Sequence, residues 1–242
     1  MDSPDDSERT DVVGARLLAT TTYTDVAAAP LVLVPLGSIE QHGPHLPLNT
    51  DAEIATAVAN QVAVGLEERL TRDVFVAPTW SYGASGEHQS FPGTTSIGSQ
   101  ALAFSLIELV RSLSTWAGRV VFVNAHGGNC TGLDKAVRQL VDEGHDVAWV
   151  ACATEALDAH AGITETSLML HIAPSTVRLE RAEPGNTEPL TDLLERMTVG
   201  GVEAVTANGV LGDPTGATAA EGERLLRLIV DDVTERIAAY AN

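Results

Sequence analysis

The sequence predicts an α/β protein, a single three-layer domain in which a mostly parallel sheet is flanked by helices. Short β-branched and apolar runs alternate with longer windows of helical periodicity, the pattern of repeated βαβ units. The apolar runs are nearly continuous, as in parallel strands that are covered on both faces. At 242 residues the chain is long enough for one such domain with a full core.

The individual elements follow from these two periodicities. Strands are predicted over residues 31–36, 74–77, 119–124 and 147–151. A helix is predicted over residues 99–116, where apolar side chains recur at helical spacing at Leu102, Leu106, Leu109, Leu113 and Trp116. Similar stripes occur after the first strand, at Ile54, Val58, Val62 and Leu66, and in a last helix over residues 219–240, at Leu226, Ile229, Val233 and Ile237.

The domain organisation is simple. Residues 1–12 are acidic and polar and are predicted to form a disordered tail, and residues 13–242 are predicted to form one domain without internal repeats. The N-terminal composition is the opposite of a secretory signal, and no apolar run approaches the ~20 residues of a membrane-spanning helix. We therefore expect a cytoplasmic protein.

The charge balance excludes some partners. A net charge of -19 repels phosphates, so neither nucleic acid nor an anionic membrane is an expected partner. Lys135 is the only lysine, a usage that fits either a GC-rich genome or a salt-adapted acidic surface. The only two cysteines, Cys130 and Cys152, are expected to be reduced.

Polar, histidine-bearing segments follow three of the predicted strands, over residues 37–51, 79–98 and 124–129. Ligands of open α/β sheets bind beyond the carboxyl ends of the strands. The three segments are therefore predicted to converge on one site.

The first segment carries the densest set of ionisable groups. Glu40 and His42 are two residues apart, so an extended backbone projects them to the same side. Asp51 is predicted to cap the following helix, and His45 to support the turn at residues 44–47. Carboxylates with an imidazole suit zinc, manganese or iron. The alternative is that Asp51 is only a cap and Glu40 only a solvated acid.

Three further segments offer candidates. His126 lies in a glycine-rich run that permits close approach to a ligand, although it could simply hydrogen-bond within its loop. Glu165 either opens a helix, favoured by the helix dipole, or completes the site as a third acid, with His160 nearby. His88 could contact substrate or organise the loop of residues 82–94.

These motifs resemble the creatininase (creatinine amidohydrolase) family over about residues 30–235. The resemblance is carried by residues 37–47 (GSIEQHGPHLP) with Asp51, 91–94 (FPGT), 124–129 (NAHGGN) and 160–167 (HAGITETS). It implies a parallel α/β fold, a centre of two divalent ions (Zn, Fe or Mn), hydrolysis of cyclic or linear amides, and a compact homo-oligomer such as a hexamer.

The resemblance also implies a ligand set. Glu40 and His126 would hold one metal and His42 the other, with Asp51 bridging the two. Creatinine-hydrolysing members have a glutamate where this chain has Gly128, which argues against creatinine as the substrate. In other branches the glutamate that matches Glu165 is a ligand instead.

Later segments resemble one branch of the family, that of mycofactocin systems. They are residues 143–150, 183–190, 200–205 and 208–218. This branch implies a peptidase that releases a Val-Tyr-derived fragment from the modified C-terminus of a precursor peptide. The alternatives are a formamide hydrolase of flavin or deazaflavin synthesis, another small-amide hydrolase, or, in a different class, an inactive metal-binding scaffold.

A two-metal site suggests a mechanism. Two ions ~3.5–4 Å apart can share a hydroxide and polarise an amide carbonyl, and a carboxylate such as Asp51 has one oxygen for each ion. His160 is predicted to pass a proton to the leaving nitrogen, in preference to His88.

Overall fold

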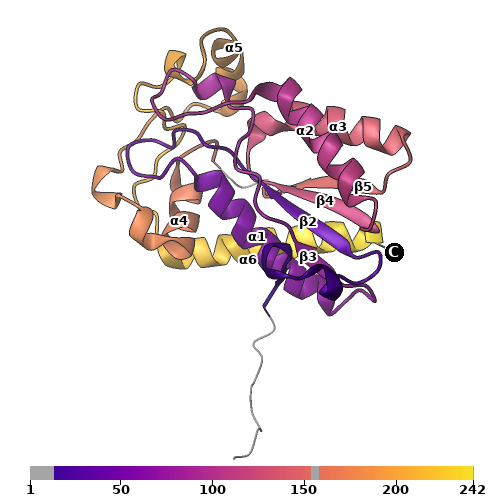
Figure 1. Ribbon diagram of the computed structural model, residues 1–242. Coiled ribbons are helices and arrows are strands. Elements are labelled where there is room, and N and C mark those ends of the chain that lie inside the picture. The colour runs from indigo at the N-terminus through magenta and orange to yellow at the C-terminus, as the bar shows by residue number, and fades with distance from the viewer. Residues whose placement is uncertain (1–13, 154–157, 242) are drawn as a thin grey trace, which may run out of the picture.

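The protein is described by a computed structural model that covers residues 14–153 and 158–241, so the predicted tail at residues 1–12 lies outside the described residues. One parallel sheet forms its centre, in the order β1-β3-β2-β4-β5 (Figure 1). Its strands are β1 (Arg16–Leu17), β2 (Leu31–Leu36), β3 (Val74–Val76), β4 (Arg119–Asn124) and β5 (Val147–Ala151).

Helices cover both faces of the sheet, which confirms the predicted three-layer α/β class. They are α1 (Thr50–Glu67), α2 (Gly98–Leu113), α3 (Cys130–Asp142), α4 (Ile163–Ile172), α5 (Leu190–Gly200) and α6 (Ala219–Ala241). Helices α1, α4 and α6 pack in one apolar core, and α2 and α3 pack in the other (Figure 1). None of the described helices has both the length and the apolar character needed to cross a membrane.

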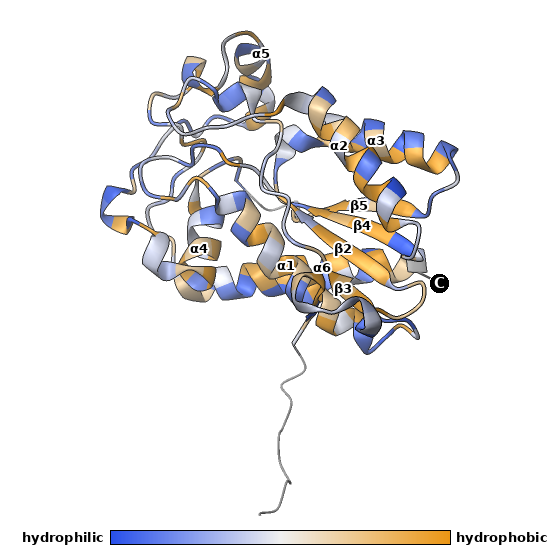
Figure 2. Ribbon diagram, in the orientation of Figure 1, coloured by the Kyte–Doolittle hydropathy of each residue, from blue (hydrophilic) through white to orange (hydrophobic). Residues whose placement is uncertain are grey.

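The apolar positions predicted from the sequence periodicities form the core. Every residue of β2 is buried, because β2 is paired on both edges and covered on both faces. The predicted stripes of α1 and α6 are buried along their whole length, and the polar faces of the helices point outward (Figure 2). Some boundaries differ: β3 ends at Val76, α2 spans Gly98–Leu113, and α6 ends at Ala241. The two-residue strand β1 was not predicted, because a run of that length shows no pattern.

The connections at the centre of the sheet create the crevice for a site. The chain leaves β2 through α1 towards β3, and leaves β4 through α3 towards β5, so neighbouring connections run to opposite sides. Such a switch point opens a crevice beyond the carboxyl ends of the strands. The segments after β2 and β4, which carry most of the predicted site residues, begin at this point.

Asn129 ties the three converging segments together. Its side-chain amide donates to the carbonyl of Gly37 after β2 (3.0 Å) and to Oδ1 of Asn124 at the end of β4 (3.0 Å). Its Oδ1 accepts from the backbone N–H of Ala84 after β3 (2.9 Å). One buried side chain therefore fixes the relative positions of all three segments.

Candidate metal centre

Asp51 lies at the centre of the site and is not a helix cap. Helix α1 begins at Thr50 and is preceded by Asn49, with no side-chain capping bond, so the predicted cap at Asp51 is wrong. The Asp51 carboxylate instead turns into the crevice, with Oδ1 3.0 Å from His42 Nε2 and Oδ2 3.4 Å from His126 Nδ1. It is 2% exposed, and a carboxylate so deeply buried requires polar or charged partners.

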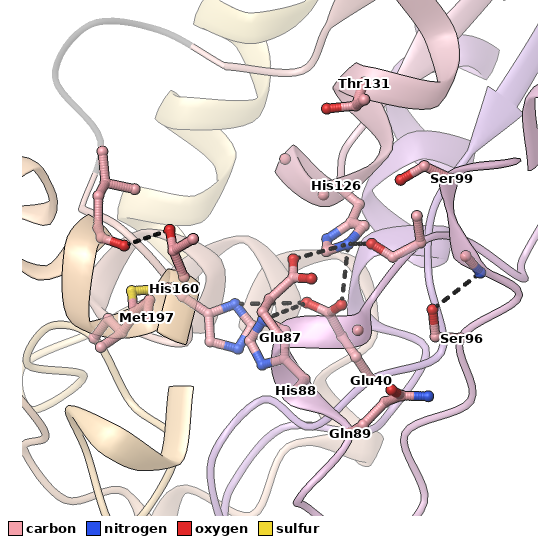
Figure 3. Close-up of a pocket in the computed structure, with 18 of the residues that line it drawn as sticks. Glu40, Glu87, His88, Gln89, Ser96, Ser99, His126, Thr131, His160 and Met197 are labelled. Atoms are coloured by element: carbon pink, nitrogen blue, oxygen red, sulfur yellow. Dashed lines mark hydrogen bonds and ion pairs between the residues drawn. The ribbon is translucent and has the colours of Figure 1, made fainter. Parts of the chain in front are cut away.

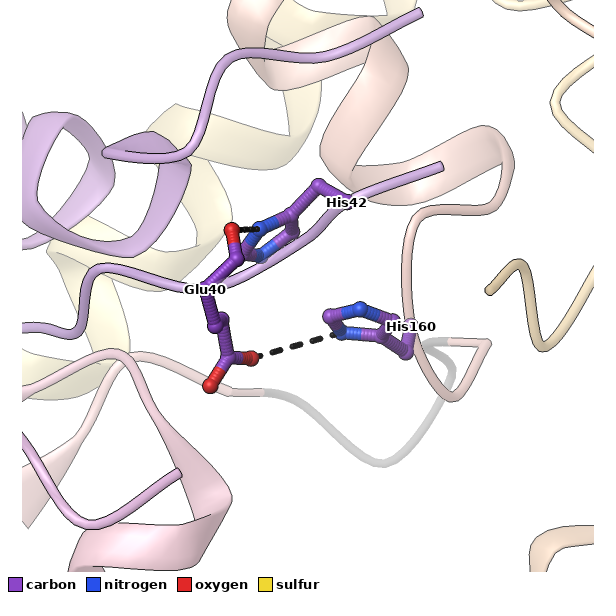
Figure 4. A group of neighbouring side chains, drawn as sticks. All are labelled: Glu40, His42 and His160. Carbon is purple, nitrogen blue, oxygen red and sulfur yellow. Dashed lines mark hydrogen bonds and ion pairs between the residues drawn. The ribbon is translucent and has the colours of Figure 1, made fainter. Parts of the chain in front are cut away.

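Among the described residues, three overlapping groups of acids and imidazoles could each hold a metal ion. In each group the ligand atoms lie within 4.8 Å of one another. The groups are Glu40–Asp51–His126, His42–Asp51–Glu165 and Glu40–His42–His160, the last shown in Figure 4. The structure thus brings together all five predicted metal ligands, and it adds His160 as a sixth candidate. Glu165 is the most open of the five, with 20% of its side chain exposed.

Backbone carbonyls orient the two central imidazoles. The carbonyl of Glu40 accepts from Nδ1 of His42 (3.1 Å), so the Nε2 lone pair faces Asp51 and Glu165. The carbonyl of Ala84 accepts from Nε2 of His126 (3.1 Å), so the Nδ1 lone pair of that ring faces Asp51. Bonds of this kind fix the tautomer of a metal-binding histidine.

Gln41 organises the two remaining imidazoles of the site. The Gln41 carbonyl accepts from His160 Nε2 (2.9 Å), which leaves Nδ1 of His160 3.8 Å from Glu40 and 3.9 Å from Glu165. The Gln41 side-chain amide donates to His88 Nδ1 (2.9 Å), so Nε2 of His88 faces Glu40 Oε1 at 3.4 Å. His88 belongs to none of the three groups, and its contact is with Glu40.

Two carboxylate oxygens of the centre are left without a hydrogen-bond donor. Glu40 Oε1 and Asp51 Oδ2 are buried and have no hydrogen-bond partner among the described residues. The other Glu40 oxygen, Oε2, accepts from the hydroxyl of Ser38 (3.1 Å). Orphaned, buried carboxylate oxygens close to imidazole nitrogens are what a divalent cation would satisfy. The residues of this site therefore fit a metal centre.

The carboxylates of the site strongly shift the pKa values of its histidines. Burial opposes charge on His42, yet Asp51 and Glu165 raise its pKa to about 10. Burial likewise opposes charge on His126, and Glu40 and Asp51 raise its pKa to about 10. Burial opposes charge on Glu40, but His126, His88 and His160 together hold its pKa well below the usual value, whereas burial raises the pKa of Asp51. In the metal-free protein, the positive charges of the His42 and His126 imidazolium rings therefore offset the negative charge of the neighbouring carboxylates.

Glu87 is a site residue that the sequence analysis missed. It lies in the short 3-10 turn Gly86–His88, lines the same cavity as Glu40, and places Oε1 3.8 Å from His126 Nε2. Burial raises the pKa of its carboxyl. Only its position next to His88, in a loop already expected near the site, could have drawn attention to it.

His45 lies outside the metal groups, and its predicted support of the turn at residues 44–47 stays a prediction. Its buried ring reaches across to α4, where Nε2 lies 2.8 Å from the hydroxyl of Thr166. Burial lowers the pKa of His45 to about 4, and the neighbouring His42 contributes in the same direction. His45 therefore joins the first segment to α4 as a neutral imidazole.

A cavity of about 940 Å³ opens in front of the centre (Figure 3). Glu40, His88, His126 and His160 form its floor. The loop of residues 86–89 and the helix α5 form walls of the cavity.

The sequence model of the family described as creatininase, creatinine amidohydrolase, matches residues 19–237. The chain belongs to this family. Its relatives include a mycofactocin precursor peptide peptidase of Mycobacterium ulcerans, 53% identical over 92% of this chain and 91% of that one. A protein of the same name from Mycolicibacterium smegmatis is 54% identical over 87% and 85% of the two chains.

A more distant relative represents another activity. It is the 2-amino-5-formylamino-6-ribosylaminopyrimidin-4(3H)-one 5'-monophosphate deformylase of Methanothermobacter thermautotrophicus. It is 34% identical over 145 residues, 58% of this chain and 59% of that one.

Solved structures of the family share the fold. A crystal structure of creatinine amidohydrolase matches with a TM-score of 0.74 and 27% identity over 93% of this chain and 97% of that one. A structure described as creatininase Mn has a TM-score of 0.73 and 27% identity over 92% and 97%. A creatininase mutant of Zn-Zn type has a TM-score of 0.70 and 26% identity over 92% and 97%.

Proposed function

We propose that this protein is a metal-dependent peptidase that hydrolyses an amide bond in a mycofactocin precursor peptide, releasing a fragment from its modified C-terminus. The observation that most directly supports a hydrolase is that the Asp51 carboxylate belongs to two adjacent candidate metal groups. The peptide substrate is supported by the two mycobacterial relatives, which are more than half identical over most of their length.

The chain's own residues define two neighbouring ligand sets. Glu40, His126 and one oxygen of Asp51 would hold one ion, and His42, Glu165 and the other Asp51 oxygen would hold the second. Bound there, divalent ions would supply a water of lowered pKa and polarise the amide carbonyl. The carbonyls of Glu40 and Ala84 keep the His42 and His126 lone pairs directed at these sets.

His160 is our proposed proton carrier. Its Nδ1 lies between Glu40 and Glu165 and it lines the cavity, so it can take up a proton from the water consumed in hydrolysis and deliver it to the leaving nitrogen. His88 serves a different purpose, since its Nε2 points at Glu40 and its Nδ1 is held by Gln41. We expect His88 to position Glu40.

The third candidate metal group gives His160 a competing role as a ligand. A His160→Asn variant separates the two roles. A proton carrier predicts that the variant binds its metal normally and loses turnover. Loss of bound metal in this variant would instead assign His160 to the ligand set.

The decisive experiment is incubation of the purified, metal-loaded protein with the modified precursor peptide, followed by mass spectrometry of the products. We expect one cleavage near the C-terminus, abolished by chelators and by His126→Ala or Asp51→Ala. Absence of any bound transition metal, with activity indifferent to chelators, would contradict the proposal.

The same assay distinguishes the alternatives. Release of formate from a formamide, without cleavage of the peptide, would favour the activity named for the Methanothermobacter relative. Metal binding without turnover of any amide would favour an inactive scaffold. The retention of all the candidate ligands in close mutual contact supports an active hydrolase.

Four further features belong to this proposal. We propose two ions per subunit, with Zn, Fe or Mn as the candidates, a homo-oligomer such as a hexamer, and a cytoplasmic location. We also propose that residues 13–242 form one domain, which the family match over 19–237 supports. Elemental analysis and sedimentation of the purified protein test the metal count and the assembly.

A further inference from the structure

Helix α5 presents an apolar face to the cavity of the metal centre. Leu190, Leu194 and Met197 are spaced four and three residues apart, which places them on one face of a helix. All three line the same cavity as Glu40, His126 and His160. The helix is anchored by a different residue, Leu193, which is fully buried.

This face is left open to the cavity. Leu190 is 40% exposed and Leu194 is 50% exposed. Apolar side chains that line a ligand cavity gain free energy when a ligand covers them. The face therefore has the properties of a ligand-binding wall.

Helix α5 is held next to the reactive groups by its C-terminal turn. Gly201, which follows the helix, has a φ of 69°. A Cβ at that position would lie 2.7 Å from the carbonyl oxygen of Glu87. Only glycine adopts this backbone geometry readily at so close an approach. The end of the helix therefore packs closely against the turn that carries Glu87 and His88.

The opposite wall of the cavity is polar. Figure 3 shows Met197 beside His160 on one side of the acids, and Ser96, Ser99 and Thr131 on the other. The cavity thus has three large apolar side chains on the α5 side and three hydroxyl groups on the other, with the candidate metal ligands between them. A substrate that spans the reactive groups meets both surfaces.

We infer that the α5 face binds an apolar side chain of the substrate, on a residue adjacent to the hydrolysed amide. This inference rests on the proposed peptidase function and names a specificity determinant of that same site. The occupant is a substrate side chain because the face is a wall of the reactive cavity itself. A small amide without such a side chain would leave the face uncovered.

The first comparison of the test uses two substrates and two enzymes. The substrates are the cleaved precursor peptide and the same peptide with the apolar residue nearest the cleavage point replaced by serine. The enzymes are the wild type and Leu194→Gln, which keeps a helix-forming residue of similar length. We expect wild type to prefer the apolar peptide at least about tenfold in kcat/KM, mainly through KM.

The Leu194→Gln variant should lose most of that preference, chiefly through a fall in kcat/KM for the apolar peptide. Met197→Gln is a second variant with the same expectation. Val199→Thr is the matched control, because Val199 lies on the same helix, is 89% exposed and does not line the cavity. It should keep the wild-type preference.

Each remaining outcome overturns the inference. Equal kcat/KM of the wild type for both peptides would show that α5 does not bind a substrate side chain. An equal loss of kcat/KM for both peptides in Leu194→Gln would show the same. If Leu194→Gln changed the sedimentation of the protein but not its preference between the two peptides, the α5 face would be assigned to contacts between subunits. Cleavage of neither peptide by wild type would refute the peptidase function as well, which distinguishes the two failures.

Discussion

The carboxylate of Glu87 occupies the space in which a side chain on Gly128 would begin. Glu87 Oε1 lies 2.5 Å from the position of a Cβ on residue 128, and His126 Nε2 lies at the same distance from it. The missing side chain at Gly128 thus makes room for an acid from a different loop. A side chain at position 128 and the Glu87 carboxylate in its present place therefore exclude each other.

A Gly128→Ala substitution should therefore damage the site without removing any ionisable group. Its Cβ would lie 2.3 Å from the carbonyl oxygen of Ala84, which belongs to the backbone and cannot rotate away. We expect displacement of His126 and a loss of turnover on the order of 10²-fold. Kinetics and bound-metal analysis of the purified variant measure both effects.

Gly127→Ala is the control for this prediction. A Cβ at Gly127 meets no atom within 4 Å among the described residues, so the same added methyl should have little effect. If Gly128→Ala retained wild-type turnover, the close packing of Glu87 against residue 128 would be wrong.

Asp51→Asn should disrupt both ligand sets at once, because Asp51 belongs to two candidate groups. We expect the loss of most bound metal and a fall in turnover of at least about 100-fold. Elemental analysis and peptide kinetics provide the measurement. Glu53→Gln is the matched control, since Glu53 lies in the same first turn of α1 but bonds Asn49 (2.7 Å) outside the site.

Metal binding should release protons at neutral pH. The pKa values of His42 and His126 lie at about 10 in the metal-free protein, so both rings are protonated at pH 7, and a ligating imidazole must be neutral. Calorimetric titration with Zn²⁺ in buffers of different ionisation enthalpy counts the protons released. A buffer-independent binding heat would contradict these raised pKa values.

The same shifts predict how the stability of the metal-free protein depends on pH. A raised histidine pKa in the folded state stabilises the fold at pH values below the unfolded pKa of about 6.5. This contribution is lost as the pH rises through about 10. Urea denaturation of the chelator-treated protein should show a falling free energy of unfolding between these values, and the metal-loaded protein should not.

His45 should make the protein sensitive to acid. Its pKa is lowered to about 4 by burial, so its contribution to stability is present above the unfolded pKa of about 6.5 and is lost as the pH falls through about 4. A Thr166→Val variant, which removes the partner of Nε2, should lower the free energy of unfolding by about 1–3 kcal/mol at pH 7. Urea denaturation across this pH range tests both statements, and a flat profile between pH 6.5 and 4 would contradict the first.

Much of the fold could be predicted because its determinants are local. Continuous apolar runs marked four of the five strands, and stripes such as Ile54, Val58, Val62 and Leu66 marked the helices that cover them. Strand β1 has two residues, both exposed, and a run of that length shows no periodicity. The error at Asp51 has a similar origin, because an acid near a helix start resembles a cap unless the direction of its side chain is known.

The sequence by itself determined which chemical groups follow the strands, and the placement of those segments at the carboxyl edge of the sheet follows from the alternation of strands and helices. Which groups meet was decided by the tertiary structure. Asp51 is shared between two groups, Glu87 fills the space above Gly128, and His45 reaches Thr166, 121 positions along the chain. Such distances depend on how the connections diverge between β2 and β4 and on the buried bonds of Asn129, and local periodicity contains no information about either.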